Sequence, residues 1–291
     1  MAELTAKANT APAEKINYKS DVKVTWCPGC GDFGVLSAVY KAFEMKGWNP
    51  KDLVVVSGIG CSSRIPYFIN SYGFHGIHGR ALPISVGLKV SNPKLKVVVL
   101  GGDGDGFSIG AGHFPHAVRR NPNLTYIIMD NSIYGLTKGQ SSPTSAFEFV
   151  TKATPYGNIE DPINPMAFAL VYGASFVAKG FSGKANDLAQ LFVQAFDHPG
   201  FSFVNVLSPC PTFNKVDTFR YYAERLATVP EDHDTSDRLK ALKIAYQTDK
   251  HTMGVYYRDF RPTLEDRLAG VREKVHMDTQ EEIEHLLSRF S

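Results

Sequence analysis

Short, continuous apolar runs recur along the first two thirds of the chain, and they predict buried β-strands. The runs at 96–100 and 124–129 are rich in Val and Ile, a composition typical of parallel strands covered on both faces. Further strands are predicted at 53–57, 175–178 and 202–207, and the helices predicted between the strands lie at 33–46, 82–90, 106–120 and 184–196. This alternation indicates βαβ units and an α/β fold with a doubly wound, mostly parallel sheet.

The segment at the start of the chain is polar. Residues 1–20 are therefore expected to stay mobile or to lie on a partner. Residues 21–211 hold the alternating elements and are predicted to form one large domain. A chain of 291 residues with 43% hydrophobic content is long and apolar enough for such a core.

The composition changes after Pro211 and becomes charged and aromatic, with little strand character. Two helices are predicted there, at 236–247 and 281–290, and Ser236 is expected to cap the first of them. Because no buried strand is predicted beyond this point, we expect residues 212–291 to form a helical C-terminal extension packed on a partner subunit.

Charge and hydropathy limit the classes of partner. A net charge of +2 is too small to argue for nucleic acid or for an acidic membrane surface. No apolar run approaches the roughly 18 residues of a membrane span. The first residues lack the apolar core of a secretory signal and hold too little Arg for a transit peptide. A cytoplasmic protein is therefore expected.

Polar turns follow the two central strands. Gly102-Asp103-Gly104-Asp105 comes after the first strand, and Asp130-Asn131-Ser132-Ile133 comes after the second. Ligands of open parallel sheets bind outside the carboxyl ends of the strands, so both turns should face one crevice. Asp103 and Asn131 suit a Mg²⁺ ion that carries a diphosphate, while the glycines let backbone N–H groups approach phosphate. Each turn alone could be merely a tight turn or an Asx turn, but the pair favours the metal.

The chain has four cysteines, in three separate segments. Cys27 and Cys30 form Trp26-Cys-Pro-Gly-Cys30, Cys61 follows the strand at 52–57, and Cys210 follows the strand at 201–207. A thioredoxin-like pair would leave two cysteines unexplained, and disulfides are the least favoured because nothing indicates secretion. Spacing alone leaves an iron–sulfur cluster, a Zn²⁺ site and free thiols open.

Gly-Asp-Gly followed by an Asn turn resembles the diphosphate motif of thiamine diphosphate enzymes. By that resemblance Mg²⁺ is bound by Asp103, Asn131 and the carbonyl of Ile133, and the segment 134–140 continues around the cofactor. Together with the four cysteines, the chain resembles the β subunit of 2-oxoacid:ferredoxin oxidoreductases over nearly its whole length. The segments 58–63 and 75–80 are most similar to the 2-oxoglutarate branch of that family.

The resemblance implies a sheet domain of the diphosphate-binding type, with thiamine diphosphate, Mg²⁺ and a [4Fe–4S] cluster on Cys27, Cys30, Cys61 and Cys210. It implies oxidative decarboxylation of a 2-oxoacid, such as 2-oxoglutarate, to CO₂ and an acyl-CoA such as succinyl-CoA, with electrons passing through the cluster to ferredoxin. The Glu that activates thiamine would come from an α subunit that carries the pyrimidine domain. The expected assembly is an αβ dimer of heterodimers.

Several residues are assigned to the site by this resemblance. Asp105 is expected to cap the following helix or to bind through its backbone, and His78 is either a polar contact of the cofactor or a structural residue. Arg64 would bind the distal carboxylate of 2-oxoglutarate, or else bridge to the α subunit. The residues expected to contact thiamine diphosphate are Ile59, Gly60, Cys61, Ser62, His78, Gly102, Asp103, Gly104, Asp105, Asn131, Gly135 and Leu136. Rival interpretations are a cluster-free thiamine diphosphate decarboxylase or synthase and a Zn-binding structural subunit.

Overall fold

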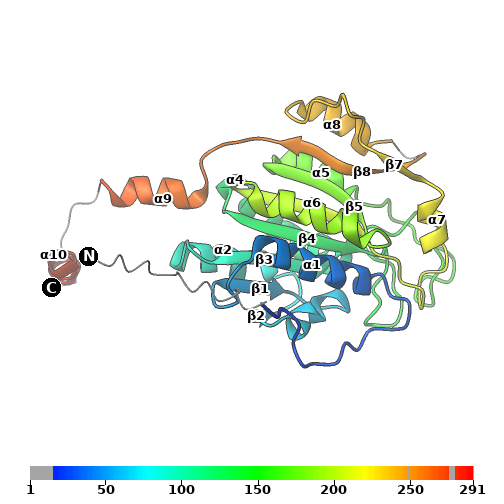
Figure 1. The fold of residues 1–291 in the computed structure, drawn as a ribbon, viewed down its shortest axis with the longest axis horizontal. Helices are drawn as coiled ribbons and strands as arrows, with labels where there is room; N and C mark the ends of the chain where they lie inside the picture. Colours follow the sequence, from blue (N-terminus) through cyan, green and yellow to red (C-terminus); the bar gives the residue numbers. More distant parts are fainter. Residues whose placement is uncertain (1–15, 248, 275–278, 291) are drawn as a thin grey trace, which may run out of the picture.

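The computed structural model describes residues 16–247, 249–274 and 279–290. These residues form one eight-stranded sheet with the strand order β2-β1-β3-β4-β6-β5-β8-β7 (Figure 1). The six strands from β2 to β5 in this order are mutually parallel, whereas β8 runs antiparallel to β5. The predicted α/β class and its mostly parallel sheet are confirmed.

The central strands lie close to where the sequence predicts them. They are β1 (Leu53–Ser57), β3 (Lys96–Gly102), β4 (Leu124–Asp130), β5 (Phe176–Phe181) and β6 (Phe201–Leu207). Every residue of β1, β4 and β6 is buried, as expected for parallel strands that helices cover on both faces. The short strand β2 (Tyr72–His75) pairs with β1 at the edge of the sheet, and the 3₁₀ helix η1 (Ser62–Phe68) connects the two.

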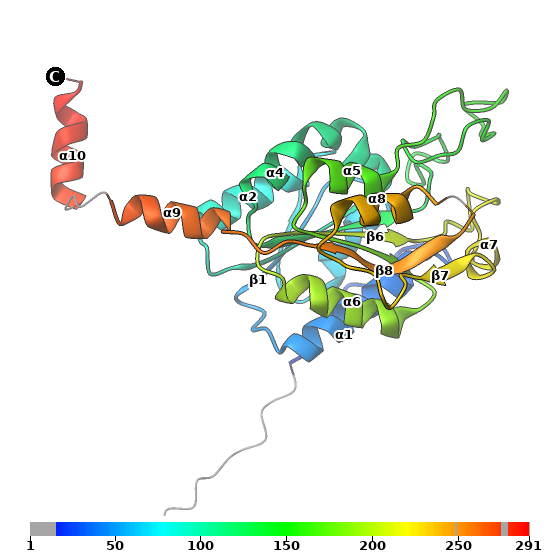
Figure 2. The same cartoon turned by 90° about the horizontal axis from the view of Figure 1, so that it is seen from above.

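Helices cover both faces of the sheet, as Figure 2 shows from above. One face carries α1 (Asp32–Lys46) and α6 (Ala185–Asp197), which pack against each other. The opposite face carries α2 (Ala81–Ser91), α4 (Phe114–Arg120), α5 (Pro165–Tyr172) and α8 (Arg238–Ala245). Each layer buries its own apolar cluster against the sheet, so the core has two halves separated by the strands.

The predicted helix at 106–120 is wrong as a single element. The segment is divided into α3 (Asp103–Phe107), the 3₁₀ helix η2 (Ile109–His113) and α4. The break lies at Ser108, whose φ of −89° and ψ of −115° are not helical, and the chain then packs so closely that a Cβ at Gly110 would lie 2.3 Å from the carbonyl oxygen of Asp105. Glycine is therefore needed at position 110, where the two segments meet.

The expectation of little strand character after Pro211 is also wrong. The segment contains α7 (Phe219–Ala223) and two strands, β7 (Leu226–Thr228) and β8 (His251–Arg258). β8 extends the sheet beyond β5 and buries the rings of Tyr256 and Tyr257 in the core. Much of the C-terminal segment therefore belongs to the chain's own sheet.

The structure also differs from the sequence prediction at the start of α8 and in the N-terminal arm. The cap of α8 is Asp237, whose side chain accepts hydrogen bonds from the N–H groups of Leu239 and Lys240, and not Ser236. Tyr18 lies within the predicted mobile arm, yet it is 2% exposed and donates a hydrogen bond to the carbonyl of Trp48. The arm prediction is therefore wrong for residues 16–20, and residues 1–15 lie outside the described part of the chain.

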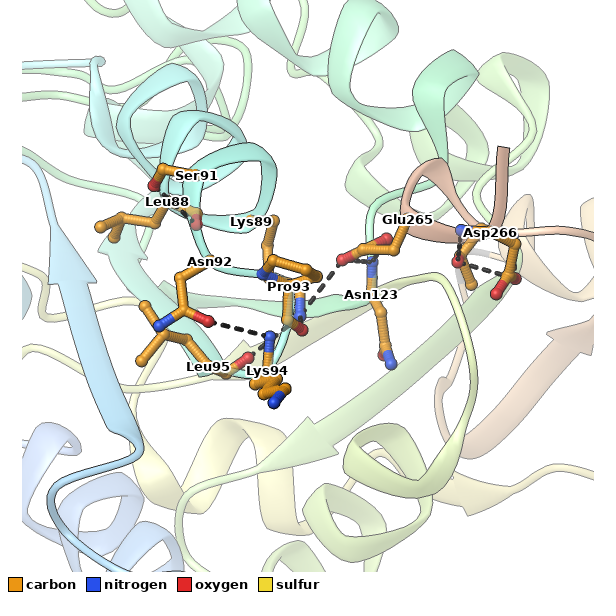
Figure 3. A network of polar contacts seen from close by, with 11 residues as sticks. Leu88, Lys89, Ser91, Asn92, Pro93, Lys94, Leu95, Asn123, Glu265 and Asp266 are labelled. Atoms are coloured by element: carbon orange, nitrogen blue, oxygen red, sulfur yellow. Dashed lines mark hydrogen bonds and ion pairs between the residues drawn. The ribbon is translucent and has the colours of Figure 1, made fainter. Parts of the chain in front are cut away.

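The last helices leave the body of the molecule. α9 (Leu264–Arg272) and α10 (Thr279–Ser288) lie beyond the sheet in both views (Figures 1 and 2). The first turn of α9 is anchored by Glu265, which forms an ion pair of 3.1 Å with the buried Lys89 of α2 and accepts hydrogen bonds from the N–H of Asn123 (Figure 3). No helix within the described residues is long and apolar enough to span a membrane.

Candidate functional site

The carboxyl ends of β1, β2, β3 and β4 bring four loops to one edge of the sheet. The loops enclose a cavity, called here the cofactor cavity. It contains each residue assigned to thiamine diphosphate or Mg²⁺ from the sequence, together with Tyr134 and Thr137. Its lining is Ile59, Gly60, Cys61, Ser62, His78, Gly102, Asp103, Gly104, Asp105, Asn131, Ile133, Tyr134, Gly135, Leu136 and Thr137.

Asp103 is a buried carboxylate at the base of the cofactor cavity, 1% exposed. Its Oδ2 accepts a hydrogen bond of 2.8 Å from Thr144, and its Oδ1 accepts one of 3.4 Å from the N–H of Asn131. Burial, reinforced by the neighbouring Asp130, raises the pKa of Asp103 to about 7. A bound divalent cation would stabilise the ionised form of this carboxyl, so the position suits a metal ligand.

The second turn places two oxygen atoms that could bind a metal in the same cavity as that carboxylate. Asn131 is 7% exposed, and its Oδ1 accepts a hydrogen bond of 3.1 Å from the N–H of Ile133, so the turn is an Asx turn. Ser132 between them has the left-handed φ of 55°. The side-chain oxygen of Asn131 and the carbonyl of Ile133 thus both belong to a strained, tightly wound turn at the cavity wall.

The side chain of Asp105 holds the other loops in place and caps no helix among the described residues, so the cap expectation is wrong, whereas binding of the cofactor through the Asp105 backbone stays a prediction. Its Oδ1 accepts hydrogen bonds from the N–H groups of Ile59 at 2.8 Å and Gly79 at 2.7 Å. Burial raises the pKa of Asp105. The side chain therefore fixes the loop that carries Gly60 and Cys61 relative to the loop that carries His78.

His78 and Tyr134 lie on one side of the cofactor cavity, with ring centroids 6.2 Å apart. The hydroxyl of Tyr134 donates a hydrogen bond of 3.2 Å to the carbonyl of Gly104. A Cβ at Gly104 would lie 2.3 Å from the Tyr134 ring, so this close approach requires glycine. Tyr134 and Thr137 belong to the segment 134–140, which the motif placed near the cofactor without assigning either side chain.

The four cysteines come together at a second cavity, called here the cysteine cavity. All four are free thiols. They come from three segments, and the lining is Thr25, Trp26, Cys27, Cys30, Cys61, Arg64, Asn131, Gly135, Leu136, Lys138, Cys210, Pro211, Thr212 and Phe213. Within the described ranges, no three His, Cys, Asp or Glu side chains form a group that could hold a metal ion. What the structure shows is that all four cysteines line one cavity.

Backbone and side-chain contacts bring the Cys27–Cys30 turn to the other two cysteines. The N–H of Gly31 donates a hydrogen bond of 2.9 Å to the carbonyl of Pro209, next to Cys210. The indole of Trp26 donates one of 2.6 Å to the carbonyl of Cys61. A Cβ at Gly31 would lie 2.6 Å from the hydroxyl of Ser208, so glycine is needed where these two loops meet.

The thiols affect one another electrostatically. Burial raises the pKa of Cys61 to about 11, and Asp32 and Cys210 add to the shift. Burial and Asp32 also raise the pKa of Cys30, with further contributions from Cys210 and Cys61. Thiolates at these positions are therefore unfavourable without a positively charged group between them, which a metal centre would supply.

The two cavities share Cys61, Asn131, Gly135 and Leu136, so they adjoin along one wall. A Cβ at Gly135 would lie 3.5 Å from the sulfur of Cys61 and 3.9 Å from that of Cys210. Arg64 lines the cysteine cavity, where its guanidinium donates a hydrogen bond of 3.1 Å to Thr25. Thus all residues assigned to the site lie in one of two connected spaces.

Comparisons with known proteins agree with this arrangement. Residues 58–206 match the family described as thiamine pyrophosphate enzyme, C-terminal TPP binding domain. Residues 210–273 match a second family, described as the C terminal of the pyruvate ferredoxin oxidoreductase beta subunit. The two matched segments meet close to Cys210, where the composition of the chain changes.

Individual relatives carry related names. The chain is 41% identical over 269 residues to subunit beta of 2-oxoacid:ferredoxin oxidoreductase 2 of Aeropyrum pernix, covering 88% of this chain and 87% of that protein. It is 45% identical over 203 residues to the 2-oxoglutarate oxidoreductase subunit KorB of Mycobacterium tuberculosis, covering 70% and 54%.

A solved structure is similar over nearly the whole chain. It is the 2-oxoglutarate:ferredoxin oxidoreductase from Magnetococcus marinus with 2-oxoglutarate, coenzyme A and succinyl-CoA bound. The TM-score is 0.89 at 50% sequence identity, covering 91% of this chain and 93% of that one. The resemblance drawn from the motifs is confirmed: the chain belongs to the β subunits of the 2-oxoacid:ferredoxin oxidoreductase family, within which it is similar to 2-oxoglutarate enzymes.

Proposed function

We propose that this chain binds thiamine diphosphate and Mg²⁺ in the cofactor cavity and a [4Fe–4S] cluster in the cysteine cavity. In complex with an α subunit it would convert 2-oxoglutarate and coenzyme A to succinyl-CoA and CO₂, and pass electrons to ferredoxin. The observation that carries the proposal is the shared wall, because it puts a site for thiamine chemistry next to one for electron acceptance.

The cofactor cavity fits the thiamine half of this proposal. Asp103, the side chain of Asn131 and the carbonyl of Ile133 offer oxygen atoms, the ligands that Mg²⁺ prefers. Gly102 and Gly104 line the cavity on either side of Asp103, where their N–H groups could bind phosphate oxygens. Bound thiamine diphosphate would supply the carbon chemistry, and this chain would supply binding and orientation.

The cysteine cavity fits a cluster better than a zinc ion. Structural zinc sites usually draw their ligands from two local pairs of cysteines, whereas this cavity is lined by one such pair and two single cysteines from separate segments. A [4Fe–4S] cluster is larger and takes four thiolates. Cys61 contacts both cavities, so the loop that holds it would set the relation between cluster and cofactor.

Arg64 supports 2-oxoglutarate as the substrate. Its guanidinium lines the space next to the shared wall, and a planar guanidinium can pair with a carboxylate through two hydrogen bonds. The Magnetococcus marinus structure contains 2-oxoglutarate and succinyl-CoA, which agrees with this choice.

The subunit names of the relatives imply an α subunit. The described residues form a single sheet, whose strand ends carry the diphosphate-type loops, so we expect the Glu that activates thiamine to come from that partner. The C-terminal helices α9 and α10 leave the body, and α10 exposes Ile283, Leu286 and Leu287. We infer that these helices pack on a neighbouring subunit of an αβ dimer of heterodimers.

The proposal is tested by anaerobic co-expression with the α subunit. The purified complex should be brown, contain iron and thiamine diphosphate, and reduce ferredoxin or a viologen dye only with 2-oxoglutarate and coenzyme A. The β chain alone should be inactive. A colourless complex containing zinc, or thiamine-dependent turnover without iron, would instead support one of the two rival interpretations.

A further inference from the structure

Asn214 is a buried side chain four residues beyond Cys210, outside both cavities. It is 1% exposed. The Nδ2 group of its amide donates two hydrogen bonds, one of 3.1 Å to the carbonyl of Asn131 and one of 2.8 Å to the carboxylate of Asp217. Its Oδ1 accepts from the N–H groups of Val216 and Asp217. The polar atoms of the side chain are therefore all used.

These contacts join the two halves of the site. The backbone N–H of Asn214 donates a hydrogen bond of 3.0 Å to the carbonyl of Cys210, while its side chain holds the carbonyl of Asn131, 83 residues away in the sequence. Asn131 lines both cavities. One residue thus connects the last cysteine loop to the turn that offers metal ligands.

The turn that Asn214 holds is under strain. Ser132 adopts a φ of 55°, which non-glycine residues rarely take, so its geometry depends on surrounding contacts. Among the described residues, the carbonyl of Asn131 accepts its hydrogen bond from Asn214. The turn keeps its hydrogen bonds with Asp103 and Ser145 when that bond is lost, so we expect the side chain of Asn131 and the carbonyl of Ile133 to shift relative to Asp103 without unfolding of the turn.

We propose that Asn214 is a positioning residue that fixes the Asn131 turn to the Cys210 loop, and so sets metal–diphosphate affinity and the environment of the cluster together. The inference rests on the proposed function, because both groups must bind for the coupling to be measured. It assigns no proton transfer and no covalent step to Asn214.

Two variants separate positioning from stability. Asn214→Asp keeps the shape of the side chain and the Oδ1 that accepts from Val216 and Asp217, but it removes both Nδ2 donors. Asn214→Asp combined with Asp217→Asn restores a donor between positions 214 and 217, whereas the carbonyl of Asn131 stays without one. The double variant should therefore recover stability without recovering the position of the turn.

Asn121→Asp is the matched control. Asn121 is fully buried, and its Nδ2 donates to the carbonyls of Arg261 and Pro262, on loops that line neither cavity. The same substitution there removes the same kind of donor to backbone carbonyls. Because the side chain of Asn121 forms no hydrogen bond with a carboxylate among the described residues, the effect on stability should resemble that of the double variant, and the binding of both cofactors should be unaffected.

The measurements are made on the anaerobic αβ complex: calorimetric titration with Mg²⁺ and thiamine diphosphate, the EPR spectrum of the reduced cluster, and urea unfolding. Asn214→Asp should weaken binding at least about fivefold, as expected for a lost hydrogen bond to a buried carbonyl, and shift the EPR spectrum. The double variant should keep both changes. Asn121→Asp should show neither.

The inference is overturned if Asn214→Asp binds as the wild type does with an unchanged spectrum, or if the double variant restores affinity. Failure of both Asn214 variants to assemble would assign the residue to folding and would also overturn it. If the wild-type complex itself shows no thiamine diphosphate binding or no cluster signal, the proposed function fails. Wild-type binding with unaffected variants removes this inference alone.

Discussion

The carboxylate of Asp105 occupies the space that a side chain at Gly58 would need: a Cβ there would lie 2.1 Å from Oδ1 of Asp105. Gly58→Ala should therefore displace the carboxylate, and with it the N–H groups of Ile59 and Gly79 that it holds. We expect thiamine diphosphate to bind the αβ complex roughly tenfold more weakly, because two hydrogen bonds to a buried carboxylate are lost. Equilibrium binding measures this.

The control for that prediction is Asp105→Asn. Its Oδ1 can still accept from both N–H groups, so most of the affinity should remain, whereas Asp105→Ala should behave like Gly58→Ala. If Gly58→Ala binds the cofactor as tightly as the wild type, the Asp105 contact does not position the loop.

The strands β3 and β4 and the turns that follow them could be predicted from sequence because their physical causes are local. Continuous Val- and Ile-rich runs indicate buried parallel strands, and polar turns at their ends must meet at one edge of the sheet. β8 was missed because its apolar residues follow charged ones and include Gly254, which weakens a strand signal. Its pairing with β5 is a long-range contact that local pattern does not reveal.

The same distinction applies within the site. Cys61 and Cys210 follow β1 and β6 along the chain, so their position at the strand ends could be inferred once the strands were predicted from the sequence. Cys27 and Cys30 precede α1, and they reach the others through the contact of Gly31 with Pro209. Thr144, which donates a hydrogen bond to Asp103, and Asn214 had no local signal either, because each lies in an irregular segment far from its partner in sequence.

Arg64 gives a prediction about specificity. If its guanidinium binds the distal carboxylate of 2-oxoglutarate, Arg64→Ala should raise KM for 2-oxoglutarate at least about tenfold, and KM for pyruvate far less. Thr25→Val, which removes the hydrogen bond that orients Arg64, should show a smaller shift of the same kind. Steady-state kinetics with 2-oxoglutarate and with pyruvate measures both KM values. An equal effect on both substrates, with weaker α-subunit association, would assign Arg64 to the interface.

The ion pair between Lys89 and Glu265 gives a prediction about stability. The Lys89 side chain is 3% exposed and that of Glu265 13%, and burial lowers the pKa of Lys89 while Glu265 opposes the shift. Glu265→Gln should cost roughly 3 kcal/mol of the free energy of unfolding, because it leaves a buried ammonium without its carboxylate. Urea unfolding of the isolated chain measures the loss.

The double variant Lys89→Met with Glu265→Gln tests the cause of that loss. Since no charge then remains buried at this contact, most of the stability should return. A double variant as unstable as Glu265→Gln would mean that the hydrogen bonds of Lys89 to the carbonyls of Pro93 and Leu95, which methionine cannot form, matter as much as the ion pair.

His198 should control part of the acid sensitivity of the fold. Its ring is 5% exposed between Phe176 and Phe260, and neither ring nitrogen has a hydrogen-bond partner among the described residues. Burial, aided by Arg258, lowers the pKa of His198 from 6.5 to about 4. As the pH falls, the unfolded chain therefore binds a proton at His198 at a higher pH than the folded chain does. The contribution of His198 to stability is complete above pH 6.5 and is lost as the pH falls toward 4. In the His198→Phe variant, the free energy of unfolding should fall by roughly 2–3 kcal/mol less than in the wild type over this pH range. Urea unfolding between those pH values measures it, and parallel profiles for variant and wild type would show that His198 is not the titrating group.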